Sequence, residues 1–142
     1  MADTITEMVR SGAMALRDFV VATRRDIHAH PELGNQETRT PRVIVDALAG
    51  LDLEIRQHVG GTGVVATLRG AHPGPTLALR ADMDALPLQE EDPRPYRSCV
   101  SGVMHACGHD GHVAMLLCAV HLLHGVREYL HGNVKFLFQP AE

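Results

Sequence analysis

Apolar residues along the chain recur in two different spacings, one typical of helices and one typical of strands. Near the N-terminus they recur at helical spacing with charged residues between them, which predicts a helix over Thr4–His28. A second helix is expected from Gln36 to Leu48, with Gly50 just beyond its end. A third is expected over Gly111–Leu130, where apolar residues cover most of the circumference and predict a buried helix.

Short apolar runs between these helices predict four strands. They are Leu53–Val59, Val64–Leu68, Thr76–Ala81 and Val134–Gln139. The run Thr76–Ala81 is apolar enough to predict a strand buried inside a sheet. Turns are expected at His72–Pro75 before it, and at Gly132 and Asn133 before the last strand. The alternation of helices and strands predicts an α/β protein, arranged as a three-layer α/β/α sandwich.

The glycine-rich stretch 60–63 lies between the first two predicted strands. It indicates a hairpin turn with positions that need positive φ. A phosphate-binding loop is the alternative, but no Lys-Ser or Lys-Thr pair follows the glycines and no helix begins there.

Composition narrows the class of protein. The 142 residues suffice for one domain, and the net charge of −4 gives no support to nucleic-acid binding. Three cysteines fit no disulfide framework and indicate a reducing compartment. No signal peptide is visible, and the longest apolar run, Val113–Leu123, is far too short to cross a bilayer. We therefore expect a cytoplasmic protein without membrane partners.

The segment 105–112 concentrates the side chains that bind divalent transition metals. It contains His105, Cys107, His109, Asp110 and His112. Side chains alternate in an extended segment, so Cys107 and His109, two positions apart, can point to the same side. The alternative is a polar loop before a buried helix, with an inert cysteine, and for an isolated Cys-x-His motif that alternative is favoured.

Two carboxylates, Asp82 and Asp84, follow the predicted strand Thr76–Ala81. Catalytic groups of open α/β sheets tend to lie where strands end. A solvated strand end is an equally good interpretation of this segment alone. The following stretch, Gln89–Ser101, is polar and contains prolines, so it is expected to be a surface loop, and Cys118 is expected to be a core residue.

Four motifs together resemble one family. They are RDIHAHPELG at 25–34, LRADMDALP at 79–87, GVMHACGHDGH at 102–112 and FQPAE at 138–142. In this order they are similar to the metal-dependent amidohydrolases, which include hippurate hydrolase and the N-acyl-amino-acid (aminoacylase-like) and indole-acetyl-amino-acid hydrolases. These enzymes are related to the dinuclear zinc exopeptidases. The resemblance covers about residues 15 to 142.

The resemblance implies a fold, a reaction and a site. The fold is an α/β/α sandwich of the zinc-exopeptidase type. A smaller lid and dimerisation domain is inserted later in these enzymes, beyond residues 1–142, and the family is often homo-oligomeric. The reaction is hydrolysis of the amide bond of N-acyl amino acids, with two divalent ions that are Zn, Mn, Co or Ni. Cys107 and His109 match metal ligands of the family, and Glu142 matches its general base. Asp82 and Asp84 are candidates for carboxylates that orient an imidazole ligand.

The family pattern also indicates what residues 1–142 do not contain. A dinuclear site needs about four or five ligands, and only two family-matched ligands are present. We therefore expect an N-terminal part of a catalytic domain that binds metal weakly and is inactive by itself. The alternative is a non-catalytic metal-binding or interaction module derived from the same fold. His105 and His112 have ligand chemistry, but the resemblance does not support them as ligands.

Overall fold

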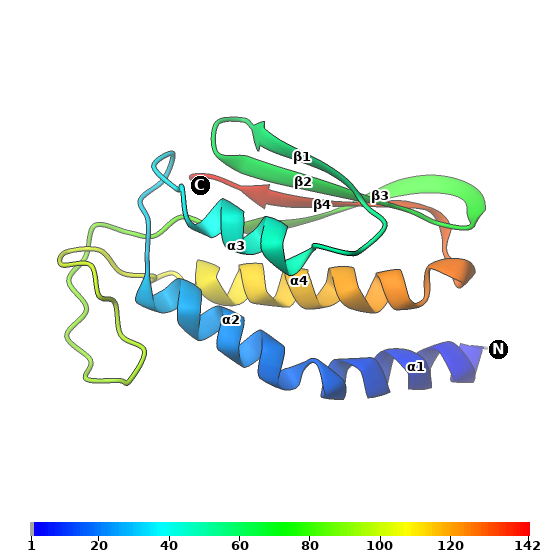
Figure 1. Ribbon diagram of the computed structural model, residues 1–142, viewed down its shortest axis with the longest axis horizontal. Helices are drawn as coiled ribbons and strands as arrows, with labels where there is room; N and C mark the ends of the chain where they lie inside the picture. The colour runs from blue at the N-terminus through cyan, green and yellow to red at the C-terminus, as the bar shows by residue number, and fades with distance from the viewer. Residues whose placement is uncertain (1) are drawn as a thin grey trace.

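A four-stranded mixed sheet and four α-helices make up residues 2–142, which the computed structural model describes (Figure 1). The helices are α1 (Ala2–Ala15), α2 (Arg17–Ala29), α3 (Thr40–Ala47) and α4 (His109–Gly125), and the short 3-10 helix η1 covers Arg127–Tyr129. The strands are β1 (Glu54–Val59), β2 (Gly63–Arg69), β3 (His72–Asp82) and β4 (His131–Gln139). The α/β class expected from the sequence is confirmed.

The strands lie in the order β1-β2-β4-β3. β1 pairs with β2 and β2 with β4 in antiparallel fashion, whereas β3 and β4 run parallel. The connection between β1 and β2 is the predicted hairpin turn, with Gly60 and Gly61 at φ values of 63° and 104°. β3 and β4 therefore end at the same edge of the sheet, while β3 has no neighbouring strand on its other side among residues 2–142.

The hydrophobic core lies between one face of the sheet and the helices. Its central residues alternate along β2 and β4 and meet α4: Val64, Ala66, Leu68, Val134, Phe136, Phe138, Val113, Leu117 and Val120. α3 and α4 lie next to the sheet, and α1 and α2 follow α4 on the side away from it (Figure 1). The opposite face of the sheet carries polar side chains such as Arg56, Thr67 and Lys135. Residues 2–142 thus contribute the sheet and one helical side of the expected sandwich.

The predicted N-terminal helix is two helices. The chain bends at Leu16, which has φ −86° and ψ −2°, although the N–H of Leu16 still donates to the carbonyl of Gly12 at 3.0 Å. Gly12 lies so close to α4 that a Cβ there would be 2.8 Å from Leu122. None of the helices in residues 2–142 has the length and apolar character needed to cross a membrane.

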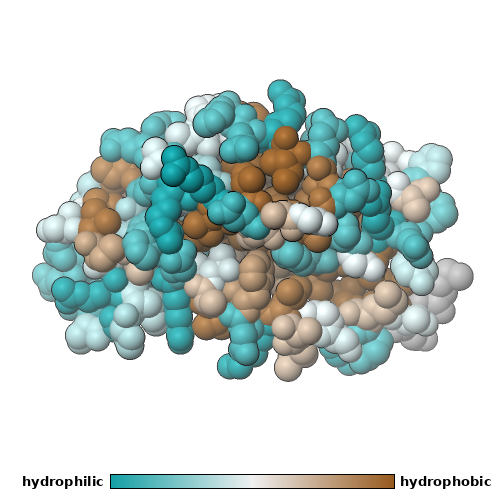
Figure 2. All heavy atoms as spheres, in the orientation of Figure 1, coloured by the Kyte–Doolittle hydropathy of each residue, from teal (hydrophilic) through white to brown (hydrophobic). Residues whose placement is uncertain are grey.

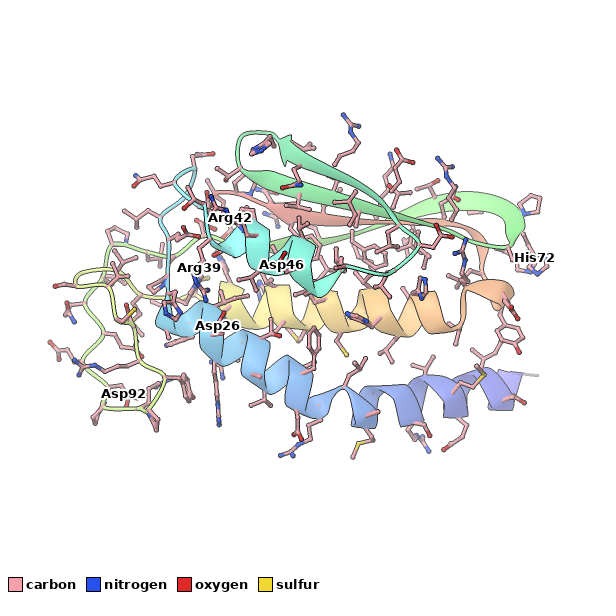
Figure 3. The ribbon with its side chains drawn as sticks, viewed as in Figure 1. Asp26, Arg39, Arg42, Asp46, His72 and Asp92 are labelled. Atoms are coloured by element: carbon pink, nitrogen blue, oxygen red, sulfur yellow. The ribbon has the colours of Figure 1, made fainter. Side chains whose placement is uncertain are left out.

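The second helix begins at Thr40, later than the predicted Gln36. The carboxylate of Glu32 accepts the backbone N–H groups of Thr38 and Arg39, at 2.8 and 2.9 Å, and that of Thr40 at 2.8 Å. A carboxylate at this point satisfies the free N–H groups of a helix N-terminus and sets where the helix starts. Arg39 also donates to both oxygens of Asp26, which joins α2 to the start of α3 (Figure 3).

The prediction of a buried strand at Thr76–Ala81 was wrong, because β3 lies at an edge of the sheet and Leu77 is 59% exposed. The predicted turns beside it were also wrong. His72 already pairs with His131, and the register shifts before Thr76 pairs with Asn133. The backbones come close here because glycine has no side chain: a Cβ on Gly132 would lie 1.9 Å from the carbonyl oxygen of Pro75. The prolines are tolerated because β3 is an edge strand.

The exposed edge of β3 generates a prediction on self-association. An unpaired strand with an apolar side chain is a site where chains pair with one another, and Figure 2 shows other apolar atoms at the surface among polar ones. Leu77→Lys should shift the chain toward monomer in multi-angle light scattering. Met14→Lys is the matched control, since Met14 is 70% exposed on α1, far along the chain from β3. A monomeric wild-type chain at high concentration, or an equal effect of both substitutions, would contradict this expectation.

Candidate metal centre

The carboxyl ends of β3 and β4 bring together most of the predicted site residues. Asp82 ends β3 and pairs in register with Gln139 at the end of β4. Asp84 and Glu142 follow these two strands, and the first turn of α4 adds His109. Ligand and catalytic groups of α/β sheets tend to collect at such an edge.

His109 is the most tightly held of these side chains. It is 3% exposed, and its Nδ1 lies 3.0 Å from a carboxylate oxygen of Asp84 and 3.0 Å from the Asp84 carbonyl oxygen. Both of those atoms are acceptors, so Nδ1 carries the hydrogen of the neutral ring and donates it. The lone pair is then on Nε2, which is the form in which imidazole binds a metal.

Two further potential ligands lie near that lone pair. Sγ of Cys107, Nε2 of His109 and a carboxylate oxygen of Glu142 all lie within 4.8 Å of one another, and Glu142 Oε2 is 3.5 Å from Nε2. Gly108 separates the first two with a φ of 88°, so the chain turns sharply between them. α4 therefore begins at His109, two residues earlier than predicted. Thiolate, imidazole and carboxylate form a donor set that suits a divalent transition metal.

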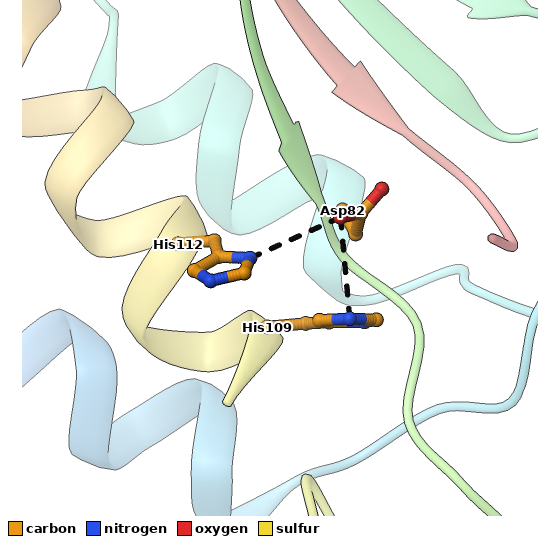
Figure 4. Close-up of side chains that lie close together, drawn as sticks. All are labelled: Asp82, His109 and His112. Carbon is orange, nitrogen blue, oxygen red and sulfur yellow. Dashed lines mark ion pairs between the residues drawn. The ribbon is translucent and has the colours of Figure 1, made fainter. Parts of the chain in front are cut away.

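A second group of donors shares His109. Oδ2 of Asp82 lies 4.0 Å from Nε2 of His109 and 3.9 Å from Nδ1 of His112, and the two imidazole rings stack at 5.5 Å between centroids (Figure 4). The guanidinium of Arg80 lies against the other oxygen, Oδ1, of Asp82. Asp82 therefore faces the free nitrogen of His109, whereas Asp84 holds the protonated one.

Two residues that were not singled out in the sequence hold the segment before Glu142. Arg80 donates to Oε1 of Gln139 at 2.6 Å, and Nε2 of Gln139 donates to the carbonyl of Ala141 at 2.9 Å. Ala141 has a φ of 51°, which L-residues rarely adopt. A Cβ on Gly34 would lie 2.8 Å from Cβ of Ala141, so the motifs at 25–34 and 138–142 meet at this point.

A buried polar cluster lies behind the site. Nδ1 of His28 is 2.8 Å from Asp110 and its Nε2 is 3.0 Å from Glu90, while Arg24 donates to Asp110 at 3.1 Å. Glu90 is 3% exposed, so its assignment to a surface loop was wrong. The remaining oxygen of Glu90 accepts the N–H of Ser98 at 2.6 Å. The cluster joins α2, the loop 90–98 and the residue next to His109.

His105 is the one imidazole of the 105–112 segment that stays apart. It is 4% exposed, and neither ring nitrogen has a hydrogen-bond partner among residues 2–142. Burial disfavours the charged ring and lowers the pKa of His105 to about 4, although the negative charge of Asp110 opposes this. His105 is therefore neutral at neutral pH.

The lowered pKa of His105 predicts a pH dependence of stability. Between pH 6.5 and 4 the unfolded chain binds a proton at this position more tightly than the folded chain does. The stabilisation is present above pH 6.5 and is lost as the pH falls toward 4, with about 2 kcal/mol lost by pH 5.

His105→Leu should remove this contribution, as measured by urea unfolding at pH 7.5 and pH 5. The exposed His131, replaced in the same way, is the control and should leave the slope with pH unchanged. An equal fall in stability for wild type and His105→Leu would contradict the assignment.

The fold and the donor set define a class of protein: an α/β protein with a candidate divalent-metal site at the ends of its parallel strands. Residues 78–142 match the Peptidase family M20/M25/M40. The chain is 43% identical over 139 residues to "Thermostable carboxypeptidase 1" of Saccharolobus solfataricus, which covers 97% of this chain and 35% of that protein. It is 48% identical over 124 residues to "N-acyl-L-amino acid amidohydrolase" of Geobacillus stearothermophilus, covering 87% of this chain and 33% of that protein.

A solved structure supports the same family assignment as the sequence relatives. The Bacillus subtilis YXEP protein, described as a dinuclear metal binding peptidase from the M20 family, superposes with a TM-score of 0.86 at 45% identity. The match covers 91% of this chain and 36% of that one. Sequence and fold together confirm that the chain is a relative of the metal-dependent amidohydrolases and peptidases of this family. It spans about a third of the length of these relatives.

Proposed function

We propose that the chain contributes part of the catalytic centre of an amidohydrolase that cleaves N-acyl amino acids. The observation that carries the proposal is the convergence of Cys107, His109 and Glu142 at the ends of β3 and β4. Relatives named N-acyl-L-amino acid amidohydrolase and N-acetylcysteine deacetylase support a small N-acyl amino acid as the substrate class.

Cys107 and His109 are the proposed metal ligands. Cys107 is exposed and forms no disulfide, so its sulfur is accessible to a metal ion. His109 reaches the same point with Nε2, and the hydrogen bond from its Nδ1 to Asp84 selects the tautomer whose lone pair is on Nε2. These donors suit zinc, and manganese, cobalt or nickel are alternatives. When bound, two divalent ions would acidify a shared water and polarise the scissile carbonyl.

Glu142 is the proposed general base. Its side chain is 61% exposed, and its carboxylate lies near His109. From there it can take the proton of the attacking water and pass it to the leaving nitrogen of the amide. Arg80 binds the side chain of Gln139, which donates to the carbonyl of Ala141 and so helps to position the residue before Glu142. Of the two orienting carboxylates expected from the sequence, Asp84 is the one that the geometry supports for the Nδ1 of His109.

A non-catalytic metal-binding module is the second candidate function. The observation that favours it is that His109 offers a single nitrogen, so the donors around it in residues 2–142 suit one cation rather than two. A dinuclear centre requires further ligands. The two candidates differ in whether hydrolysis accompanies metal binding.

We predict that Cys107→Ser weakens metal binding by more than about tenfold, because a serine hydroxyl stays protonated where a thiol ionises on binding. Titration with Co²⁺, followed by its visible absorption, measures the affinity. The exposed, free Cys99, replaced by serine, is the matched control and should leave the affinity unchanged. Equal affinities for wild type and Cys107→Ser would exclude Cys107 as a ligand.

We also predict that the 142-residue chain alone does not hydrolyse hippurate or N-acetyl amino acids, with Zn²⁺ or Mn²⁺ added. The reason is that the second metal has too few ligands to stay bound. Release of free amino acid, compared with a chelator-treated sample, is the measurement. Metal-dependent turnover that Glu142→Gln abolishes would contradict this prediction, and would mean that another copy or an unrecognised ligand completes the centre.

A further inference from the structure

A second cation position is suggested by the way Asp82 faces two imidazoles. Oδ2 of Asp82 lies 4.0 Å from Nε2 of His109 and 3.9 Å from Nδ1 of His112. Both distances are too long for hydrogen bonds. The three ligand atoms nevertheless lie within 4.8 Å of one another, and Figure 4 shows Asp82 opposite both rings. The side chains converge on a point that none of them fills.

The spacing of these atoms fits a shared ion. Two nitrogen or oxygen ligands of a tetrahedral zinc, each about 2.1 Å from the metal, lie about 3.4 Å apart. Both distances exceed this value by about half an ångström, so Asp82 and His112 would each move by a few tenths of an ångström to share an ion. We propose that Asp82, His109 and His112 form a second divalent-cation position, which excludes a cation at Cys107 because both need the same Nε2 of His109.

Two of the three ligands, His109 and Asp82, are held in the orientation that this position requires. Asp84 binds Nδ1 of His109 and leaves Nε2 free. Arg80 lies against Oδ1 of Asp82 and leaves Oδ2 toward the rings. His112 follows His109 by three residues in α4, so the two side chains lie on one face of the helix. Outer contacts of this kind are typical of metal sites.

A groove gives a hydrated ion access to this position. It has a volume of about 380 Å³ and lies between the edge strand β3 and α4. Its lining residues include Leu79, Arg80, Asp82, His112, Met115 and Leu116. Asp82 and His112 are the ligands that line this groove. The side chain of His112 is 46% exposed, so solvent reaches it directly.

The chemistry of the second position differs from that at Cys107. Two imidazoles and a carboxylate suit Zn²⁺, Co²⁺ or Ni²⁺ and need no thiolate. A cation can therefore remain on His109 when the exposed thiol of Cys107 is oxidised or alkylated. This inference shares His109 with the proposed function but uses neither Cys107 nor Glu142.

Titration of the Cys107→Ser chain with Co²⁺ tests the inference. We expect it to keep one saturable Co²⁺ site whose spectrum lacks the thiolate-to-metal charge-transfer band of the wild type. In this background, His112→Gln or Asp82→Asn should weaken binding more than about tenfold, because even the loss of an outer contact costs that much. Wild-type chain alkylated with iodoacetamide should retain the same site.

The control uses a pair of histidines at the other end of the sheet. His72 and His131 stack at 4.6 Å between ring centroids, far from the start of α4 (Figure 3). Replacing both with glutamine in the Cys107→Ser chain should leave the site unchanged. Circular dichroism checks that each variant folds, and His112→Gln alone decides the test if Asp82→Asn does not fold, because His112 is partly exposed.

Two outcomes would overturn the inference. One is that the Cys107→Ser chain shows no saturable binding of Co²⁺. If the wild type shows the thiolate band in that case, the ligand role proposed for Cys107 is still supported. The other is that binding to Cys107→Ser persists unchanged in His112→Gln. Conversely, a wild type without the thiolate band, together with a site lost in His112→Gln, supports the second position and excludes the first.

Discussion

Parallel pairing of β3 with β4 is the constraint on which the site depends. The pairing in register of Ala81 with Phe138 and Asp82 with Gln139 makes both strands end at one edge of the sheet. The residues that follow, Asp84 on one side and Glu142 on the other, are thereby placed within reach of the start of α4. Phe136 and Phe138, both almost fully buried, fix this register from the core side, because a slip by one residue would turn them to solvent.

The start of α4 is held by α2 as well as by the residues at the end of the sheet. Asp110 is fully buried, and it would be costly there without partners, since an unpaired buried charge loses its hydration. His28 and Arg24 supply them from α2, and Glu90 meets the other nitrogen of His28 from a distant loop. Both nitrogens of His28 thus face carboxylates. Within the motif at 25–34, His28 therefore acts on the site indirectly, by fixing the residue beside His109.

A single nitrogen governs what this centre can bind. His109 presents only Nε2, and two donor sets reach it, one with Cys107 and Glu142 and one with Asp82 and His112. The first offers a thiolate, and the second offers a carboxylate and another imidazole. The softness of the cation and the state of the thiol would decide between them. The further ligands that a dinuclear centre requires are not found around this nitrogen in residues 2–142.

Local chemistry in the sequence determined the elements and the reactive groups. Spacing of apolar residues predicts the helices and the β1–β2 hairpin, because amphipathic periods and glycine turns are local properties. The ligand chemistry of Cys107 and His109 is likewise visible from eight neighbouring positions. Starts of helices were predicted less well: the carboxylate of Glu32 that sets the start of α3 comes from eight residues earlier.

Only the tertiary structure decided which groups meet. Glu90 lies in a polar stretch of the sequence that predicts a surface loop. It is buried because it pairs with His28, which lies 62 positions away along the chain. The apolar composition of β3 predicts an interior strand, yet β3 lies at the edge of the sheet. The reason is that strand order depends on long-range pairing and not on composition. Asp82 and Asp84 are equivalent in the sequence and face opposite nitrogens of His109 in the structure. The sequence determined which chemistry is available, whereas packing at the strand ends determined which atoms share one point in space.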